Sequence, residues 1–374
     1  MAVLIFILLL SLLVIIHELG HFFVARRRKV RVEEFGFGYP PRLFKLFHWQ
    51  GTDFTLNAIP FGGFVKLEGE EYEPDRPVAK QRASTAFYTK PALDRIAVIA
   101  AGPVANILFG MIAFSIVFGL VGVPRFLADR PRIGEVAADS PAEAAGIQAD
   151  YEVVGFRLFD EYVATPKIKD VVAFTSVNRG QSVTVVLVGP CENLVCPETK
   201  IEKTIYIRPE AEVPEGQGAI GLVFTDYVFE TGPWYLRIVR GIGYGIQEAL
   251  TLGALIVMAV INLLRNLFMN GQVPADVAGP IGIVHQASKY QLLSQGFAPL
   301  LEFAGMLSIN LGIMNALPIP ALDGGRILFI FLEKIIGRKR IQNIEGYVHY
   351  GGFILLLGLI ILISLRDVAQ IFKT

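Results

Sequence analysis

The sequence is poor in cysteine and has no excess of charge of either sign. Its 374 residues include only two cysteines, Cys191 and Cys196, which are too few for a four-cysteine zinc site. The 34 basic and 34 acidic side chains balance to a formal net charge of zero, so nothing suggests a nucleic-acid partner. What remains is a hydrophobic chain, because 53% of its residues are hydrophobic and its mean hydropathy of +0.51 is too high for an ordinary soluble protein.

The first hydrophobic stretch covers residues 2–25. At about 1.5 Å per residue it is long enough to cross a bilayer as a helix. It has no basic segment before the apolar run and no convincing cleavage site before Arg26, so we expect a retained transmembrane helix rather than a cleaved signal peptide. The basic run at residues 26–29 follows at once, and the positive-inside rule places this end in the cytoplasm and Met1 outside.

The motif HELGH at residues 17–21 lies inside this stretch. On a helix, the HExxH spacing puts His17 and His21 on one face, where both can bind one zinc ion, and leaves Glu18 beside them as a general base. Ionisable side chains at membrane depth are costly and mark functional sites. The motif therefore predicts a hydrolase whose metal lies within the bilayer, near the cytoplasmic face.

A catalytic zinc ion usually takes three protein ligands and leaves one position for water. The remaining histidines, at positions 48, 285 and 349, do not lie at membrane depth beside a motif. The best third ligand is Asp323, in the segment NALPIPALDGG at residues 315–325, where two prolines break the helix and two glycines allow close backbone approach. The alternative is that Asp323 only caps the following helix.

Further apolar segments at about residues 93–123, 300–319 and 351–365 predict three more transmembrane helices. Residues 249–264 are apolar enough for a fifth. A fifth span would, however, place the basic loop at residues 333–340 outside and Asp323 at the wrong face. We therefore predict four spans and interpret residues 234–270 as an amphipathic or partly embedded helix, with a re-entrant arrangement left open.

Three features between these helices carry hypotheses of their own. Residues 30–68 predict a small β-meander, in which Gly62 and Gly63 form either a tight turn or an exposed strand edge with room for another backbone. Asn106 in the second helix is either a packing contact or a contact to substrate or active site. In the insert at residues 128–225, two predicted strands flank the cysteines, and a disulfide is expected if this insert is external, with free thiols as the alternative.

HELGH, the sequence GPVAN at residues 102–106 and NALPIPALDGGR at residues 315–326 together resemble the site-2 protease family of intramembrane zinc metalloproteases. The likeness is greatest to the bacterial branch that cleaves membrane-bound anti-sigma factors. It implies that Zn²⁺ is the cofactor, held by His17, His21 and Asp323, with Glu18 activating water. It also implies, with the hypothesis on Asn106, a set of substrate-binding residues: Gly62, Gly63, Phe64, Asn106, Asn315 and Pro318.

The insert resembles a single PDZ domain. Residues 133–136 and the sequence SPAEAAGI at residues 140–147 match the beginning of such domains. The turn at residues 148–151 and the stretch at residues 154–157 depart from the usual pattern. The resemblance therefore implies the PDZ fold and leaves open whether the groove binds a peptide or protein.

The sequence thus predicts an α-helical polytopic membrane protein with four transmembrane helices, a membrane-associated β-hairpin or meander and one inserted extracytoplasmic PDZ-like α+β domain. The expected parts are a membrane core at residues 1–127, the PDZ-like domain at 128–225, an amphipathic region at 226–298 and a second part of the membrane core at 299–374.

The expected function is regulated intramembrane proteolysis at the inner membrane of a bacterial cell. The expected substrates are transmembrane segments of single-pass membrane proteins, such as anti-sigma-factor-like proteins or signal-peptide remnants, and the bilayer is the other partner. Two rivals are a metal transporter, which needs further ligands along a pore, and a non-catalytic PDZ adaptor, which needs no intact HExxH motif.

Overall fold

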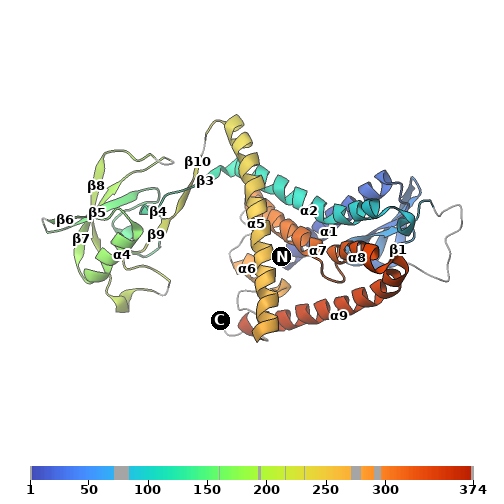
Figure 1. Ribbon diagram of the computed structural model, residues 1–374. Coiled ribbons are helices and arrows are strands. Elements are labelled where there is room, and N and C mark those ends of the chain that lie inside the picture. The colour runs from blue at the N-terminus through green and yellow to red at the C-terminus, as the bar shows by residue number, and fades with distance from the viewer. Residues whose placement is uncertain are drawn as a thin grey trace. The chain divides into compact units, whose positions relative to one another are not determined.

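The computed structural model divides the chain into two compact units, Met1–Leu120 with Ile238–Thr374, and Val121–Arg237. The residues that it describes are 2–70, 84–159, 161–192, 195–214, 216–230, 232–270, 279–289 and 296–371. Parts of the predicted amphipathic region, residues 271–278 and 290–295, lie outside the described residues. Figure 1 shows the long helices of the first unit and the sheet of the second.

The first unit is built mainly from long apolar helices. Five helices of the described chain are long and apolar enough to cross a membrane: α1 (Ala2–Arg27), α2 (Ala92–Val121), α5 (Trp234–Asn270), α7 (Phe297–Ala316) and α9 (Arg338–Ile371). Two shorter helices, α6 (Pro280–Lys289) and α8 (Asp323–Ile336), and the 3₁₀ turn η1 (Phe87–Thr89) accompany them. Large apolar side chains such as Leu8, Ile112 and Leu357 are exposed on these helices, as a lipid solvent allows.

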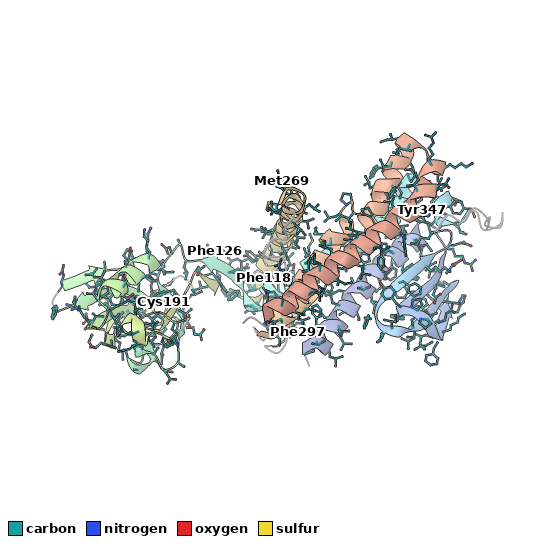
Figure 2. The ribbon with its side chains drawn as sticks, turned by 90° about the horizontal axis from the view of Figure 1, so that it is seen from below. Phe118, Phe126, Cys191, Met269, Phe297 and Tyr347 are labelled. Atoms are coloured by element: carbon teal, nitrogen blue, oxygen red, sulfur yellow. A yellow bond between two sulfur atoms is a disulfide. The ribbon has the colours of Figure 1, made fainter. Side chains whose placement is uncertain are left out.

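Helix α5 makes the number of candidate spans one larger than the sequence predicted, because it continues unbroken through the apolar residues 249–264. Figure 1 shows it running crosswise to α2, α7 and α9, and the turned view in Figure 2 agrees. It approaches α2 closely through small residues: a Cβ atom on Gly241 would lie 2.5 Å from the backbone nitrogen of Gly119, and one on Gly245 would lie 2.4 Å from that of Ser115.

The prediction of a basic loop at residues 333–340 is wrong, because this segment is helical except at one residue. Helix α8 continues to Ile336, α9 begins at Arg338, and only Gly337 separates them, with a φ of +95°. Glu333 accounts for part of the difference, since its carboxylate pairs with Arg95 of α2 at 2.5 Å and Arg338 at 3.9 Å. Charges that suggested a basic loop are thus partly neutralised between helices.

Strands β1 (Val32–Trp49) and β2 (Thr52–Leu67) form an antiparallel hairpin that folds back on itself. Phe37 is opposite both Leu56 and Gly63, because β2 bends and places its two halves on either side of the first part of β1. The positive φ of +73° at Gly62, which glycine adopts without strain, lies near this bend. Two long strands therefore make a sheet of four short legs, similar in form to the predicted meander.

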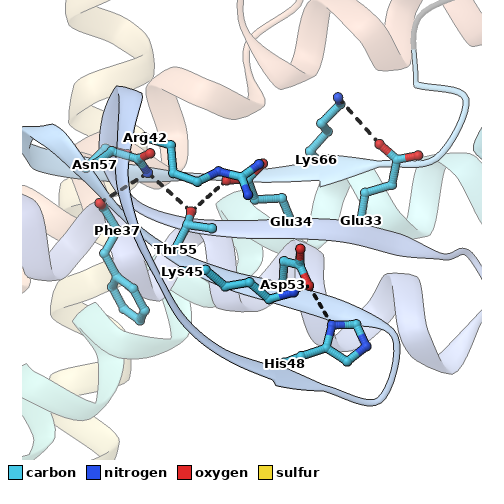
Figure 3. A network of polar contacts seen from close by, with 11 residues as sticks. Glu33, Glu34, Phe37, Arg42, Lys45, His48, Asp53, Thr55, Asn57 and Lys66 are labelled. Atoms are coloured by element: carbon cyan, nitrogen blue, oxygen red, sulfur yellow. Dashed lines mark hydrogen bonds and ion pairs between the residues drawn. The ribbon is translucent and has the colours of Figure 1, made fainter.

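The hairpin carries a polar network and a large apolar surface. In Figure 3, Asp53 lies between Lys45 and His48. Its Oδ1 is 2.6 Å from Nζ of Lys45 and 2.5 Å from Nδ1 of His48. Hydrogen bonds from these two groups, chiefly that of Lys45, lower the pKa of the Asp53 carboxyl group. Glu34 accepts a hydrogen bond of 2.7 Å from the hydroxyl of Thr55. The exposed large apolar side chains of the first strand are Tyr39, Leu43, Phe44, Leu46, Phe47 and Trp49.

The second unit is an α+β domain. Its main sheet has the order β8-β7-β5-β4-β9, with β6 on β5, and a separate ribbon pairs β3 with β10. The strands are β3 (Val123–Phe126), β4 (Arg132–Val136), β5 (Glu152–Leu158), β6 (Glu161–Ala164), β7 (Ser182–Val188), β8 (Lys200–Tyr206), β9 (Leu222–Thr225) and β10 (Tyr227–Glu230). The helices are α3 (Pro141–Ala144), α4 (Ile168–Val177) and the 3₁₀ turn η2 (Glu210–Glu212).

The core of this domain contains fully buried side chains from several strands, among them Ile133, Val153 and Phe156. The strands expected on either side of the cysteines are β7 and β8. The expected disulfide between Cys191 and Cys196 is present, with an S–S distance of 2.05 Å. The β3–β10 ribbon makes the compact unit wider than the predicted insert, which lies within it.

Candidate metal centre

Helices α1 and α2 approach each other closely at two glycines. A Cβ atom on Gly20 would lie 2.3 Å from the carbonyl oxygen of Ala101. One on Gly102 would lie 2.3 Å from Nε2 of His21 and 2.6 Å from Nε2 of His17. The two imidazoles therefore pack directly on the bare backbone of α2, and this contact defines where they lie.

The structure brings together the three predicted ligands. Oδ2 of Asp323 lies 2.9 Å from Nε2 of His17 and 3.4 Å from Nε2 of His21, and the two Nε2 atoms are 3.1 Å apart. The preceding residue, Leu322, is the N-cap of α8, so the carboxylate of Asp323 faces the imidazoles rather than capping its helix. The three side chains thus form a compact group able to hold one metal ion.

The irregular segment between α7 and α8 delivers Asp323 to this point. A Cβ atom on Gly324 would lie 2.1 Å from the carbonyl oxygen of Leu317, and one on Gly325 would lie 2.3 Å from that of Ile319. The chain folds so tightly here that only glycine fits at both positions. The expectation that the glycines of LDGG allow close backbone approach is confirmed.

The surroundings of the two histidines fit a zinc ion bound through both Nε2 atoms. Nδ1 of His21 lies 2.8 Å from the carbonyl oxygen of Val98, which it reaches as an N–H donor. Nδ1 of His17 lies 3.3 Å from Nδ2 of Asn106, and Oδ1 of the same amide is buried without a partner among the described residues, so turning the amide over by 180° presents that oxygen to Nδ1. Metal-binding histidines characteristically donate their second N–H to such an oxygen, which fixes tautomer and ring orientation.

We expect Asn106→Ala to weaken zinc binding by about 10- to 100-fold, the usual cost of losing such an outer hydrogen bond. The affinity of the variant and of wild type for zinc is measured by a zinc competition titration of the purified proteins. Ser308→Ala is the matched control, because the Ser308 hydroxyl is equally buried and donates to the Asn106 backbone oxygen at 2.9 Å without contacting His17. Equal zinc affinity in the Asn106 variant and wild type would contradict this role.

A cavity of about 330 Å³ opens beside the three ligands. It is bounded by α1, the hairpin, α2 and the start of α8, and its lining residues are His17, Glu18, His21, Tyr39, Gly63, Phe64, Val65, Leu67, Glu70, Phe87, Val98, Ile99, Ala321, Asp323 and Arg326. A Cβ atom on Gly63 would lie 3.8 Å from Cγ of Glu18, so the last leg of β2, residues 63–66, passes directly beside this carboxylate. The cavity therefore joins ligands, a candidate base and a strand.

The predicted substrate-binding residues differ in their positions. Gly63 and Phe64 line the cavity, whereas Gly62 lies outside its lining, with its N–H 3.4 Å from the hydroxyl of Ser11. Asn315 is half-buried at the end of α7, Pro318 is exposed in the following segment, and neither belongs to the lining. Asn106 is fully buried against His17, in agreement with the hypothesis of an active-site contact.

Sequence reasoning missed three polar side chains of the cavity. Arg326 lies one helical turn after Asp323, so the motif LDGGR contained a signal for it. Tyr39 and Glu70 had no such signal, because only the folding back of the hairpin brings them to α1.

The model of peptidase family M50 matches residues 5–359 of this chain. A predicted zinc metalloprotease of Clostridium acetobutylicum is 30% identical over 366 residues, which cover 97% of this chain and 96% of the relative. One of Rhizobium meliloti is 32% identical, with 98% of this chain and 96% of the relative covered. The regulator of sigma-E protease RseP of Escherichia coli is 28% identical, with 98% of each covered.

Proposed function

The chain belongs to peptidase family M50 and is a membrane zinc metalloprotease of the site-2 protease type, and on that premise we propose that it cleaves transmembrane segments of single-pass proteins within the bilayer. The observation that carries the proposal is the cavity that joins the ligand group, Glu18 and the last leg of β2. Likeness to a relative named as a regulator of sigma-E protease supports anti-sigma-factor-like substrates.

In this proposal His17, His21 and Asp323 hold the zinc ion, and Glu18 is the general base. Zinc, when bound, supplies a Lewis acid and lowers the pKa of water toward neutrality. Glu18 accepts a proton from the attacking water, whose oxygen bonds to the carbonyl carbon, and returns the proton to the leaving amine as the C–N bond breaks. The position of Glu18 in the cavity lining, beside all three proposed ligands, supports this role.

The substrate must unwind before cleavage, because a helix shields its peptide bonds with its own hydrogen bonds. The last leg of β2, Gly63–Lys66, pairs with β1 on one side only among the described residues. We define residues Gly63–Leu67 as the docking edge. An unwound substrate would add to it as a further strand, and the backbone hydrogen bonds would hold a peptide beside Glu18.

Two observations support the proposed orientation, with Met1 and the inserted domain outside a bacterial inner membrane and the metal near the cytoplasm. Helix α5 packs crosswise to α2, α7 and α9, which supports a position of α5 along the membrane and leaves the other four long helices as spans. The disulfide between Cys191 and Cys196 supports an oxidising compartment for the inserted domain. That domain, which resembles a PDZ domain, would exclude untrimmed substrates by size.

The transporter rival is less well supported. Outside the proposed centre, the described residues contain one further group of metal-type side chains, Glu152 with Cys191 and Cys196. Its two sulfur atoms are joined to each other, so they do not continue an ion path. The adaptor rival leaves the intact group of Glu18, His17 and His21 without a purpose.

We expect purified full-length protein in liposomes to cleave a single-pass substrate lacking its external domain, and to cleave the untrimmed substrate more slowly. A chelator such as 1,10-phenanthroline should abolish cleavage, and added Zn²⁺ should restore it, because the ligand group supplies no nucleophile of its own. Product mass and zinc content are the measurements. Cleavage that persists in metal-free protein would contradict the proposal, as would zinc-loaded protein that cuts no membrane substrate.

A further inference from the structure

Glu70 and Arg326 form an ion pair in the cavity, although 256 positions separate them. Arg326 belongs to α8, the helix that begins with Asp323, and Glu70 follows the end of β2 by three residues. The pair therefore connects the docking edge to the helix that carries a proposed zinc ligand. The reaction described above uses neither side chain.

The backbone N–H groups of the docking edge alternate in direction. The N–H of Glu68 points back toward the first strand and donates to Arg31 at 2.9 Å. The preceding residue, Leu67, points the other way, and its N–H donates to Oε2 of Glu70 at 3.3 Å; by the same alternation the N–H of Val65 also faces outward, into the cavity that Val65 and Glu18 both line. The outward groups are those that an added strand would use.

Glu70 therefore occupies the last outward N–H of the edge. Its Oε2 accepts from Leu67 while its Oε1 pairs with Arg326. The Glu70 side chain is 24% exposed, so it lies largely inside the cavity at the point where an added strand would continue.

We propose that Glu70, held by Arg326, is a stop that sets the register of the substrate strand, an inference that rests on the proposed function. An incoming strand that pairs along the docking edge meets the Glu70 carboxylate at Leu67 and can advance no further. Because side chains and N–H groups alternate with a period of two, freeing the Leu67 N–H allows a slip of two residues. The pair thus determines which peptide bond lies beside Glu18.

The test compares product ends for wild type, Glu70→Ala, Arg326→Gln and Arg326→Lys by mass spectrometry on the trimmed substrate. We expect one major cut in wild type and, in Glu70→Ala and Arg326→Gln, a major cut displaced by two residues. Cleavage at the original bond should fall by about 100-fold, because even a small misplacement of the substrate lowers the reaction rate by about that factor. Arg326→Lys, which keeps the charge, should retain the single cut, and zinc content should stay equal in all four.

Arg338→Gln is the matched control. Arg338 is 42% exposed against 39% for Arg326 and also pairs with a glutamate, Glu333 on α8, but it lies outside the cavity lining. This variant should keep the wild-type cut.

Hydrogen exchange provides a readout that needs no cleavage. Loss of the stop should speed exchange in residues 62–70 in the Glu70 and Arg326→Gln variants but not in the control. Unchanged exchange, or faster exchange with an unshifted cut, would overturn the inference and leave the proposed function standing. Zinc-loaded wild type that cuts nothing would overturn both.

Discussion

Glu18→Gln is expected to bind zinc as wild type does and to lose cleavage by about 100- to 10,000-fold, the usual contribution of a general base. Glutamine has the size of glutamate and can still occupy the space beside Gly63, but its amide cannot accept the proton of the attacking water. The three proposed ligands are unchanged in this variant. The expected loss therefore lies in the rate of the chemical step and not in metal binding.

The measurement is the cleavage rate of the trimmed substrate in liposomes, with zinc content determined on the same samples. Glu302→Gln is the matched control, because Glu302 also belongs to a membrane-type helix, α7, but lies outside the cavity lining. Equal cleavage by the Glu18 variant and wild type would refute the proposed base. Loss of zinc together with activity would show instead that Glu18 is needed to form the metal site.

The proposed ligand group could be predicted from the sequence because it follows from short-range rules. The spacing of His17 and His21 places both on one helix face, and this holds in any fold that keeps α1 helical. Asp323 needed one long-range argument, that zinc takes a third ligand and that basic loops lie on one side of the membrane. Both arguments depend on chemistry and composition, which the sequence carries directly.

Other parts of the site depend on tertiary pairing that no local pattern specifies. Glu70 reaches the cavity only because β2 bends at Gly62 and places its last leg beside α1. The pattern of β1 and β2 predicted extended chain but not which legs would pair. Charge at residues 333–340 indicated a basic loop, whereas the contact of Arg95 with Glu333, 238 positions away, exists only in the folded protein.

Gly102→Ala is expected to abolish zinc binding and cleavage together, although alanine is the better helix former. The new Cβ atom would lie 2.3 Å from Nε2 of His21, closer than nonbonded atoms approach, so the imidazoles must move. They have little freedom to do so, because Val98 and Asn106 hold their Nδ1 atoms. In a helix interior alanine is more stable than glycine by about 1 kcal/mol, so the helix itself should not be weakened.

Gly119→Ala in the same helix separates this steric effect from a general effect of substituting glycine in α2. A Cβ atom there meets nothing closer than 3.9 Å, at Cα of Ile238, so this variant should keep its zinc and its cleavage rate. Zinc content, cleavage rate and thermal unfolding of the two variants are the measurements. We expect Gly102→Ala to remain folded without zinc, since the hairpin packs on α1 through Phe22, Phe35 and Phe54 independently of the histidines. Full zinc occupancy in Gly102→Ala would mean that the imidazoles do not need the bare backbone of α2, and that their placement comes from Asp323 and Asn106 alone.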